Sequence, residues 1–170
     1  RYGEQADACI TEGTAALFDG YRRMQGSSAE VANILNLPVV LLVNARMAGY
    51  SVAPLLYGYK HFYSGVHIAG VIFNQVSSPA HYAYLREACS DTGLDCLGYL
   101  PVMEGIKPSS KHNAISLSNR RMIDEQTDLI ATQLEKSIDI NRMLNRCNRN
   151  FPCQYTLPYY SDIEDDMHTF

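Results

Sequence analysis

Two carboxylates lie close together in a glycine-containing stretch near the start of the chain. Glu12 precedes Gly13, and Asp19 follows seven residues after Glu12, directly before Gly20. The short run over residues 6–11 is a strand candidate that would deliver Glu12 to a strand end. Ligands of α/β proteins collect at the carboxyl ends of strands, so magnesium and phosphate chemistry is expected here. The alternative is a surface loop with two scattered acids, because a single motif is only a hypothesis.

The elements that must position these acids alternate along the chain. Continuous apolar runs rich in β-branched residues predict buried strands. The predicted strands cover residues 6–11, 38–43, 66–73 and 96–100. Apolar residues at helical spacing predict helices that begin at Ser27 and that cover residues 45–62, 80–91, 119–136 and 138–147. Strands separated by helices of this size imply right-handed crossovers, so the predicted fold class is α/β, a mostly parallel sheet with helices on both faces.

Local motifs support three of these helices. Ser27 and Glu30 have the spacing of a capping box, in which each side chain bonds a backbone amide near the other residue. Pro54 is expected in the first turn of its helix, and Asp139 is a candidate cap for the last one. Residues 102–118 show no clear period, which predicts a loop that could fold over a ligand.

Composition and charge exclude several classes of protein. The 170 residues suffice for one sizeable core, and the formal net charge of −4 with a pI near 5.7 argues against nucleic-acid binding. Any electrostatic attraction for an anionic substrate would therefore have to be local. No apolar run reaches membrane-spanning length, and no segment is similar to a signal peptide.

The five cysteines form an odd set without Cys-x-x-Cys spacing. They are Cys9, Cys89, Cys96, Cys147 and Cys153. This pattern favours reduced, buried thiols in a cytoplasmic protein over a zinc site or a disulfide framework.

Six ordered blocks of sequence resemble one known family. Glu12-Gly13 followed by Leu17-Phe18-Asp19-Gly20 resembles the Glu-Gly … Gly-Leu-Phe-Asp-Gly signature of the amino-terminal synthetase domain of the cobyrinic acid a,c-diamide synthase family. The other blocks are residues 27–32, 37–46, 58–62, 68–74 and 97–101. Several blocks in the same order are far more specific than one motif.

Three residues depart from the family pattern. Ala16 stands where the family usually has Gly, which could tighten the loop backbone. Asn44 stands where Asp is common, and Gln75 replaces the usual Arg after Asn74. The last two departures put phosphate or base contacts in doubt.

The resemblance implies a fold and an activity. The fold would be that of P-loop NTPases, similar to dethiobiotin synthetase. The activity would be ATP-dependent amidation of a corrinoid carboxylate: ATP phosphorylates the carboxylate, and ammonia displaces the acyl phosphate. The cofactors implied are ATP and Mg²⁺, because such transfers depend on positioning and on neutralising charge.

The resemblance also implies roles for individual residues. Glu12 would hold Mg²⁺, and Asp19 would lie near the substrate carboxylate as an acid–base group. Asn74 would contact the nucleotide base, and without the resemblance it is more simply a turn residue at a strand end. The turn residues expected to line the same nucleotide pocket are Gly98, Leu100 and Pro101. Because Glu12, Asn74 and Pro101 would all follow parallel strands, one shared sheet edge is expected for them.

A phosphate-binding loop is absent from this sequence. Gly93 and Gly98 have its glycine spacing, but Tyr99 follows instead of Lys. The resemblance therefore implies a fragment whose lysine-bearing loop lies upstream and whose glutaminase domain lies downstream. On this interpretation residues 1–150 are a partial synthetase domain and residues 151–170 are a linker or tail. The chain alone is then not expected to catalyse the full reaction.

Two further interpretations stay open. A relative that amidates another tetrapyrrole, or a dethiobiotin-synthetase-like ligase, would use the same fold. A non-catalytic α/β binding module would keep the sheet and lack the phosphate loop throughout the gene. The substrate tetrapyrrole, the order of amidation and a homodimeric state are not determined by the sequence.

Overall fold

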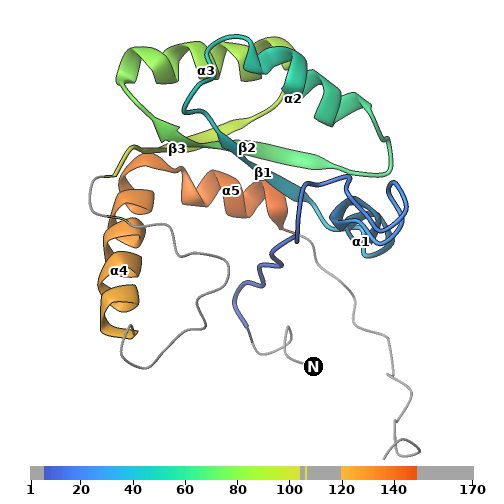
Figure 1. Cartoon of the computed structure of the whole chain (residues 1–170), viewed down its shortest axis with the longest axis horizontal. Helices are drawn as coiled ribbons and strands as arrows, with labels where there is room; N and C mark the ends of the chain where they lie inside the picture. The colour runs from blue at the N-terminus through green and yellow to red at the C-terminus, as the bar shows by residue number, and fades with distance from the viewer. Residues whose placement is uncertain (1–5, 104–105, 107–119, 149–170) are drawn as a thin grey trace, which may run out of the picture.

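The structure is a computed structural model that describes residues 6–103, 106 and 120–148. Helices and strands alternate along most of this part (Figure 1). In chain order they are α1 (Ser28–Ile34), β1 (Val39–Asn44), α2 (Val52–His61), β2 (Ile68–Val76), α3 (Pro79–Thr92), β3 (Cys96–Pro101), α4 (Arg120–Ser137) and α5 (Ile140–Cys147). None of the described helices is long and apolar enough to cross a membrane.

The sheet has three strands in the order β1-β2-β3, and both pairings are parallel. Val43 of β1 lies opposite Phe73 of β2, and Phe73 lies opposite Tyr99 of β3. The central strand β2 is apolar on both faces, which is why its sequence is a continuous run rather than an alternating one. The predicted parallel strands at 38–43, 66–73 and 96–100 are confirmed.

Helices cover both faces of this sheet (Figure 1). On one face α2 and α3 pack on the main core, where Phe73, Leu56 and Leu85 are fully buried. On the other face Ile72 and Leu97 pack against Ile138, at the junction of α4 and α5. The α/β class with helices on both faces is therefore confirmed.

The predicted helix caps are present, with one change of partner. The Ser27 hydroxyl accepts the Glu30 amide at 3.2 Å, but the Glu30 carboxylate accepts the amide of Gly26 at 2.6 Å. Pro54 lies in the first turn of α2, and Asp139 caps α5 by accepting the Arg142 amide at 2.9 Å. These caps satisfy amides that the first turn of a helix leaves without a partner.

One expected strand is absent, and one expected helix begins later than predicted. Residues 6–11 form no strand, and all of their side chains are exposed. This prediction was wrong because Ile10 is the only large apolar residue there, and Ala and Asp favour strands weakly. Residues 45–51 form turns, so α2 begins only at Val52. Most of the loop predicted over 102–118, and all of 151–170, lie outside the described residues.

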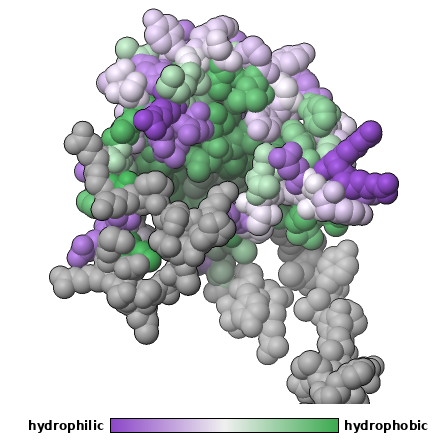
Figure 2. Space-filling model, viewed as in Figure 1, coloured by the Kyte–Doolittle hydropathy of each residue, from purple (hydrophilic) through white to green (hydrophobic). Residues whose placement is uncertain are grey.

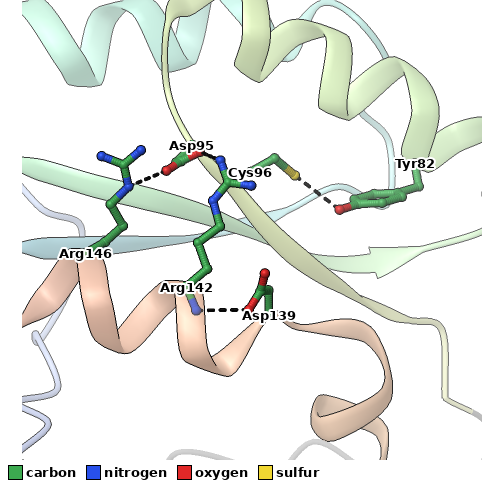
Figure 3. Close-up of polar contacts among 6 residues, drawn as sticks. All are labelled: Tyr82, Asp95, Cys96, Asp139, Arg142 and Arg146. Atoms are coloured by element: carbon green, nitrogen blue, oxygen red, sulfur yellow. Dashed lines mark hydrogen bonds and ion pairs between the residues drawn. The ribbon is translucent and has the colours of Figure 1, made fainter.

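Ion pairs attach α5 to Asp95, the residue before β3 (Figure 3), and a close backbone contact attaches the α4–α5 junction to the middle of β3. Asp95 pairs with Arg142 and with Arg146, whose Nε lies 2.6 Å from the second carboxylate oxygen. Further along β3, Gly98 forms an isolated antiparallel bridge with Ile138. The amide of Asp139 donates to the carbonyl of Leu97 at 2.9 Å, so the α4–α5 junction lies directly against β3.

Candidate functional site

The carboxyl ends of the three strands meet at one edge of the sheet. Asn44 of β1 lies opposite Asn74 of β2, and Val76 of β2 lies opposite Pro101 of β3. This edge is where ligands of open parallel sheets bind. Asn74 and Pro101 therefore lie on the same side, as the sequence predicted for these two residues.

Asn74 has one free hydrogen-bonding group. Its Oδ1 accepts the amide of Gln75 at 2.8 Å, and its backbone carbonyl accepts the amide of Ala45 at 2.8 Å. Gln75 has a φ of +62° at an irregularity of the β2–β3 register. The local turn therefore fixes the Asn74 side chain, while its amide NH₂ has no partner among the described residues and can donate to a ligand.

The three predicted pocket residues of β3 differ in exposure. Leu100 and Pro101 are half-buried at the carboxyl edge, whereas Gly98 is buried. An added Cβ on Gly98, whose φ is +144°, would lie 2.3 Å from the carbonyl oxygen of Ser137. This close contact requires glycine at position 98 whether or not a nucleotide binds nearby.

A histidine that sequence analysis did not single out holds the β1–α2 connection at this edge. The His81 Nε2 lies 2.5 Å from the carbonyl oxygen of Ala48, and its Nδ1 lies 3.2 Å from the amide of Ser77. A carbonyl needs a donor and an amide needs an acceptor, so the hydrogen bonds assign the proton to Nε2. No local motif signals this contact, because Ala48 and His81 are 33 residues apart.

The two acids of the Glu12–Asp19 loop lie elsewhere. The carbonyl of Thr14 accepts the Ser28 hydroxyl at 3.3 Å, and the ring of Phe18 lies 5.8 Å from that of Tyr59. Because α2 returns the chain to the start of β2, its last turn, which contains Tyr59, lies at the amino end of the sheet (Figure 1). The structure thus does not bring this loop to the edge of Asn74 and Pro101.

The expectation of one shared edge is wrong for a physical reason. No strand forms over residues 6–11, so no element carries Glu12 to the carboxyl end of the sheet. Instead the apolar residues of the loop determine where it packs. Leu17 packs on the main core, and Phe18 also contacts Phe62 with ring centroids 5.0 Å apart.

Both acids are exposed, and their side chains have no hydrogen bond or ion pair to other described residues. The described part of the chain contains no group of three or more His, Cys, Asp or Glu that could hold a metal ion. That finding is compatible with Mg²⁺, which proteins commonly hold through one or two carboxylates together with substrate phosphates.

A polar cluster in the core joins Tyr82, Cys89 and Cys96 (Figure 3 shows the first and last). A hydrogen bond from Cys89, with smaller contributions from Tyr82 and the Gly98 amide, lowers the pKa of Cys96 to about 6. The same bond, together with burial, raises the pKa of Cys89. The four described cysteines are free, but only Cys89 is buried: Cys96 and Cys147 are partly buried and Cys9 is exposed.

We expect Cys96 to react with iodoacetamide as a thiolate near neutral pH. Its alkylation rate should be half-maximal near pH 6, whereas an ordinary cysteine has a pKa of about 8.5. Mass spectrometry of the Cys96 peptide across pH measures this midpoint. Tyr82→Phe removes one hydrogen bond to the sulfur and should move the midpoint upward. A midpoint at the ordinary cysteine value would show that the cluster does not stabilise the thiolate.

The parallel sheet and its flanking helices define an α/β domain, and the family model that matches the chain makes it P-loop NTPase-like. The chain belongs to the AAA domain family, whose model matches residues 2–110. No solved structure matches the chain with statistical significance.

Curated relatives agree on a narrower resemblance. The chain is 34% identical over 146 residues to the cobyrinate a,c-diamide synthase of Salmonella typhimurium, covering 83% of this chain and 32% of that protein. It is 40% identical over 149 residues to the Gloeobacter violaceus protein of the same name, covering 84% and 32%. It is 34% identical over 139 residues to the hydrogenobyrinate a,c-diamide synthase of Brucella ovis, covering 81% and 32%. The chain thus spans about a third of the length of these relatives, and the predicted resemblance is confirmed.

Proposed function

We propose that this chain is the synthetase portion of an enzyme that amidates the a and c carboxylates of cobyrinate, with ATP as the energy source. The supporting observation is the similarity to relatives named for that reaction, which extends over 81–89% of the chain. The Leu17-Phe18-Asp19-Gly20 block also favours this branch over dethiobiotin synthetase.

The chemistry explains why ATP is needed. A carboxylate is a poor acyl donor, so its oxygen attacks the γ-phosphorus of ATP, which forms an acyl phosphate and releases ADP. Ammonia then attacks the acyl carbon, loses a proton and expels inorganic phosphate. Bound Mg²⁺ would neutralise charge on the phosphates during the first step.

The proposed roles of the residues follow from their side chains. Asn74 would donate its free NH₂ to the nucleotide base, and Leu100 and Pro101 would line the pocket beside it, with Gly98 supporting the same turn. Glu12 would be the Mg²⁺ ligand, because that ion prefers oxygen donors. Asp19 would take the proton from attacking ammonia.

This mechanism requires the acidic loop to reach the nucleotide. In the structure the two sets of residues lie at opposite ends of the sheet, so the loop has to move or rearrange for both steps to share one site. Few contacts would resist the movement. The loop is attached through the packing of Leu17 and Phe18, through the Thr14–Ser28 hydrogen bond, and through the Ala29 amide, which donates to the Leu17 carbonyl at 2.9 Å.

The surrounding protein would supply the nitrogen. The relatives are about three times as long as the matched segment, which leaves room for the proposed downstream glutaminase domain. Ammonia from solution could replace glutamine in an assay. The proposal includes a cytoplasmic location, in keeping with the free thiols, and leaves open whether the enzyme is a homodimer.

A chimera tests the proposal directly. Residues 1–150 would replace the matching segment of the Salmonella typhimurium enzyme, and the product of cobyrinate with ATP, Mg²⁺ and ammonia would be measured by mass spectrometry. We expect ATP-dependent addition of two amides. A folded chimera that binds nucleotide but forms no amide would favour the non-catalytic binding module. Preference for hydrogenobyrinate would favour the second named substrate instead.

In an active chimera, Glu12→Gln should raise the Mg²⁺ concentration needed for half-maximal activity. Loss of an outer hydrogen-bond partner of a metal ligand typically costs about 10–100-fold in affinity, so loss of a direct carboxylate ligand should cost at least about tenfold. A magnesium titration of the amidation rate measures the effect. Glu87→Gln, an exposed acid on α3, is the matched control. An unchanged magnesium requirement would remove Glu12 from the metal site.

A further inference from the structure

A pocket of about 480 Å³ opens beside the Asp19 loop. Its walls include two adjacent arginines, Arg22 and Arg23, together with Glu30 and Tyr63. Small-molecule sites commonly have volumes of about 300–1,000 Å³, so the pocket is large enough for part of a ligand. We call it the arginine pocket. Figure 2 shows strongly hydrophilic side chains projecting at the end of the molecule where Figure 1 places α1.

A compact turn fixes the backbone that carries the two arginines. The amide of Gly20 donates to the carbonyl of Arg23 at 2.7 Å, and the amide of Gln25 donates to that of Arg22 at 3.2 Å. Arg23 has a φ of +56°, in the left-handed region. A Cβ on Gly20 would lie 2.0 Å from the Gln25 carbonyl oxygen, so the turn needs glycine at this position. The backbone is therefore pre-organised even though the arginine side chains are exposed.

The donors of the pocket have no acceptor among the described residues. The guanidinium groups of Arg22 and Arg23 have no hydrogen bond or ion pair within the described part of the chain. The Tyr63 hydroxyl accepts the side-chain amide of Asn33 at 3.0 Å, which leaves its own proton free to donate. The Tyr63 ring is held in place against Gly65, where an added Cβ would lie 2.7 Å from it.

The pocket is locally positive in a chain of net negative charge. Glu30 is its one acid, and that carboxylate already accepts the amide of Gly26 at 2.6 Å. Guanidinium forks match carboxylates in geometry and in charge, and a phenol hydroxyl adds a third donor. With two guanidinium groups against one carboxylate, the pocket suits an anionic oxygen ligand better than a cation.

We propose that the arginine pocket binds a non-reacting carboxylate of the polycarboxylate substrate. The inference rests on the proposed function, since the formation of a diamide requires a substrate with at least two carboxylates. Asp19 lies directly before the turn that carries the arginines, so in the observed position of the loop a carboxylate held in the pocket places the rest of the substrate beside Asp19. The held carboxylate keeps its charge during the reaction, so it can position the substrate throughout the step.

Binding to the 170-residue chain tests the pocket without requiring catalysis. Isothermal calorimetry would compare cobyrinic acid with its fully esterified form, and 1,2,3-propanetricarboxylate with its triamide. We expect both acids to bind and both neutral forms to bind at least about tenfold more weakly. Arg22→Ala and Arg23→Ala should each weaken binding of the acids by about 10–100-fold, because hydrogen bonds to charged groups are the strong ones.

Three variants separate binding from folding. Arg86→Ala, an exposed arginine on α3, is the matched control and should bind like the unmodified chain. Arg22→Lys should recover only part of the affinity, since lysine keeps the charge but not the fork. Tyr63→Phe should weaken binding while its ring still packs against Gly65. Circular dichroism would check that each variant is folded.

The outcomes distinguish the pocket from the proposed reaction. One result would be that the double variant Arg22→Ala with Arg23→Ala is folded and binds cobyrinic acid as tightly as the unmodified chain. That result would overturn the proposed role of the arginine pocket even if the chimera amidates cobyrinate. A different result would be that the tricarboxylate binds and needs the arginines, while cobyrinic acid does not bind and the chimera is inactive. That result would support a carboxylate pocket and reject the proposed function.

Discussion

Replacing Gly98 by alanine is expected to destabilise the fold by about 3 kcal/mol or more. The new methyl carbon would lie 2.3 Å from the Ser137 carbonyl oxygen and 2.7 Å from the Ile138 Cα, so two backbone segments would have to separate. Overpacking costs about 1–3 kcal/mol, and an unfavourable backbone conformation costs about 1–3 kcal/mol more. A domain of this size is stable by only about 5–15 kcal/mol.

Urea unfolding followed by circular dichroism measures this change. The slope of such curves for small proteins is about 1–3 kcal/mol per molar, so the midpoint should fall by roughly 1 M or more. Gly58→Ala is the matched control, because Gly58 lies inside α2 with nothing within 4 Å of an added Cβ. That control should be neutral or stabilising, since alanine favours helices by up to about 1 kcal/mol.

The Gly98 experiment also separates two explanations of one residue. The family resemblance assigns this glycine to a nucleotide pocket, whereas the structure gives it a close contact with the α4–α5 junction. If the urea midpoint of Gly98→Ala equals that of the unmodified chain, the α4–α5 junction does not pack against Gly98 as closely as in the structure. A stable variant with weaker nucleotide binding would instead favour the pocket role.

The strands and helices were predictable wherever burial alone determines the pattern. The runs Val39–Val43 and Ile68–Phe73 are apolar throughout, as is typical of strands in a sheet covered on both faces, although Leu42 of the edge strand β1 is exposed. The end of β2 was less predictable, because Asn74 is a typical turn residue. The strand nevertheless continues to Val76, which pairs with Pro101 after an irregularity of register.

The site residues were predictable as residue types but not as a spatial arrangement. Asn74 and Pro101 meet because they end adjacent parallel strands, and such an arrangement follows from strand order. The predicted position of the Glu12–Asp19 loop depended on a strand over residues 6–11 that does not form. The packing of Leu17 and Phe18 determines the position of the loop instead. The Cys89–Cys96 contact and the arginine pocket arise from tertiary packing, for which single-sequence periodicity carries no signal.

Replacing Asp19 by asparagine in the active chimera is expected to lower the amidation rate by about 100–10,000-fold. The substitution keeps the shape of the side chain and removes its charge and basicity, and general acid–base groups commonly contribute a factor of this size. Asp19 is exposed and its side chain has no partner in the described part of the chain, so the fold should be nearly unaffected. Surface substitutions of this kind usually change stability by less than about 0.5 kcal/mol.

Two measurements on the same protein isolate the catalytic role. Calorimetry with ATP and Mg²⁺ should give an affinity close to that of the unmodified chimera, because Asp19 is not proposed to contact the nucleotide. Product formation should fall equally with glutamine and with free ammonia, since the proposed step follows the delivery of ammonia. Asp7→Asn, an exposed acid of the same segment, is the matched control and should retain full activity. Unmodified rates for Asp19→Asn with both nitrogen donors would leave Asp19 as a loop acid without a part in the chemistry.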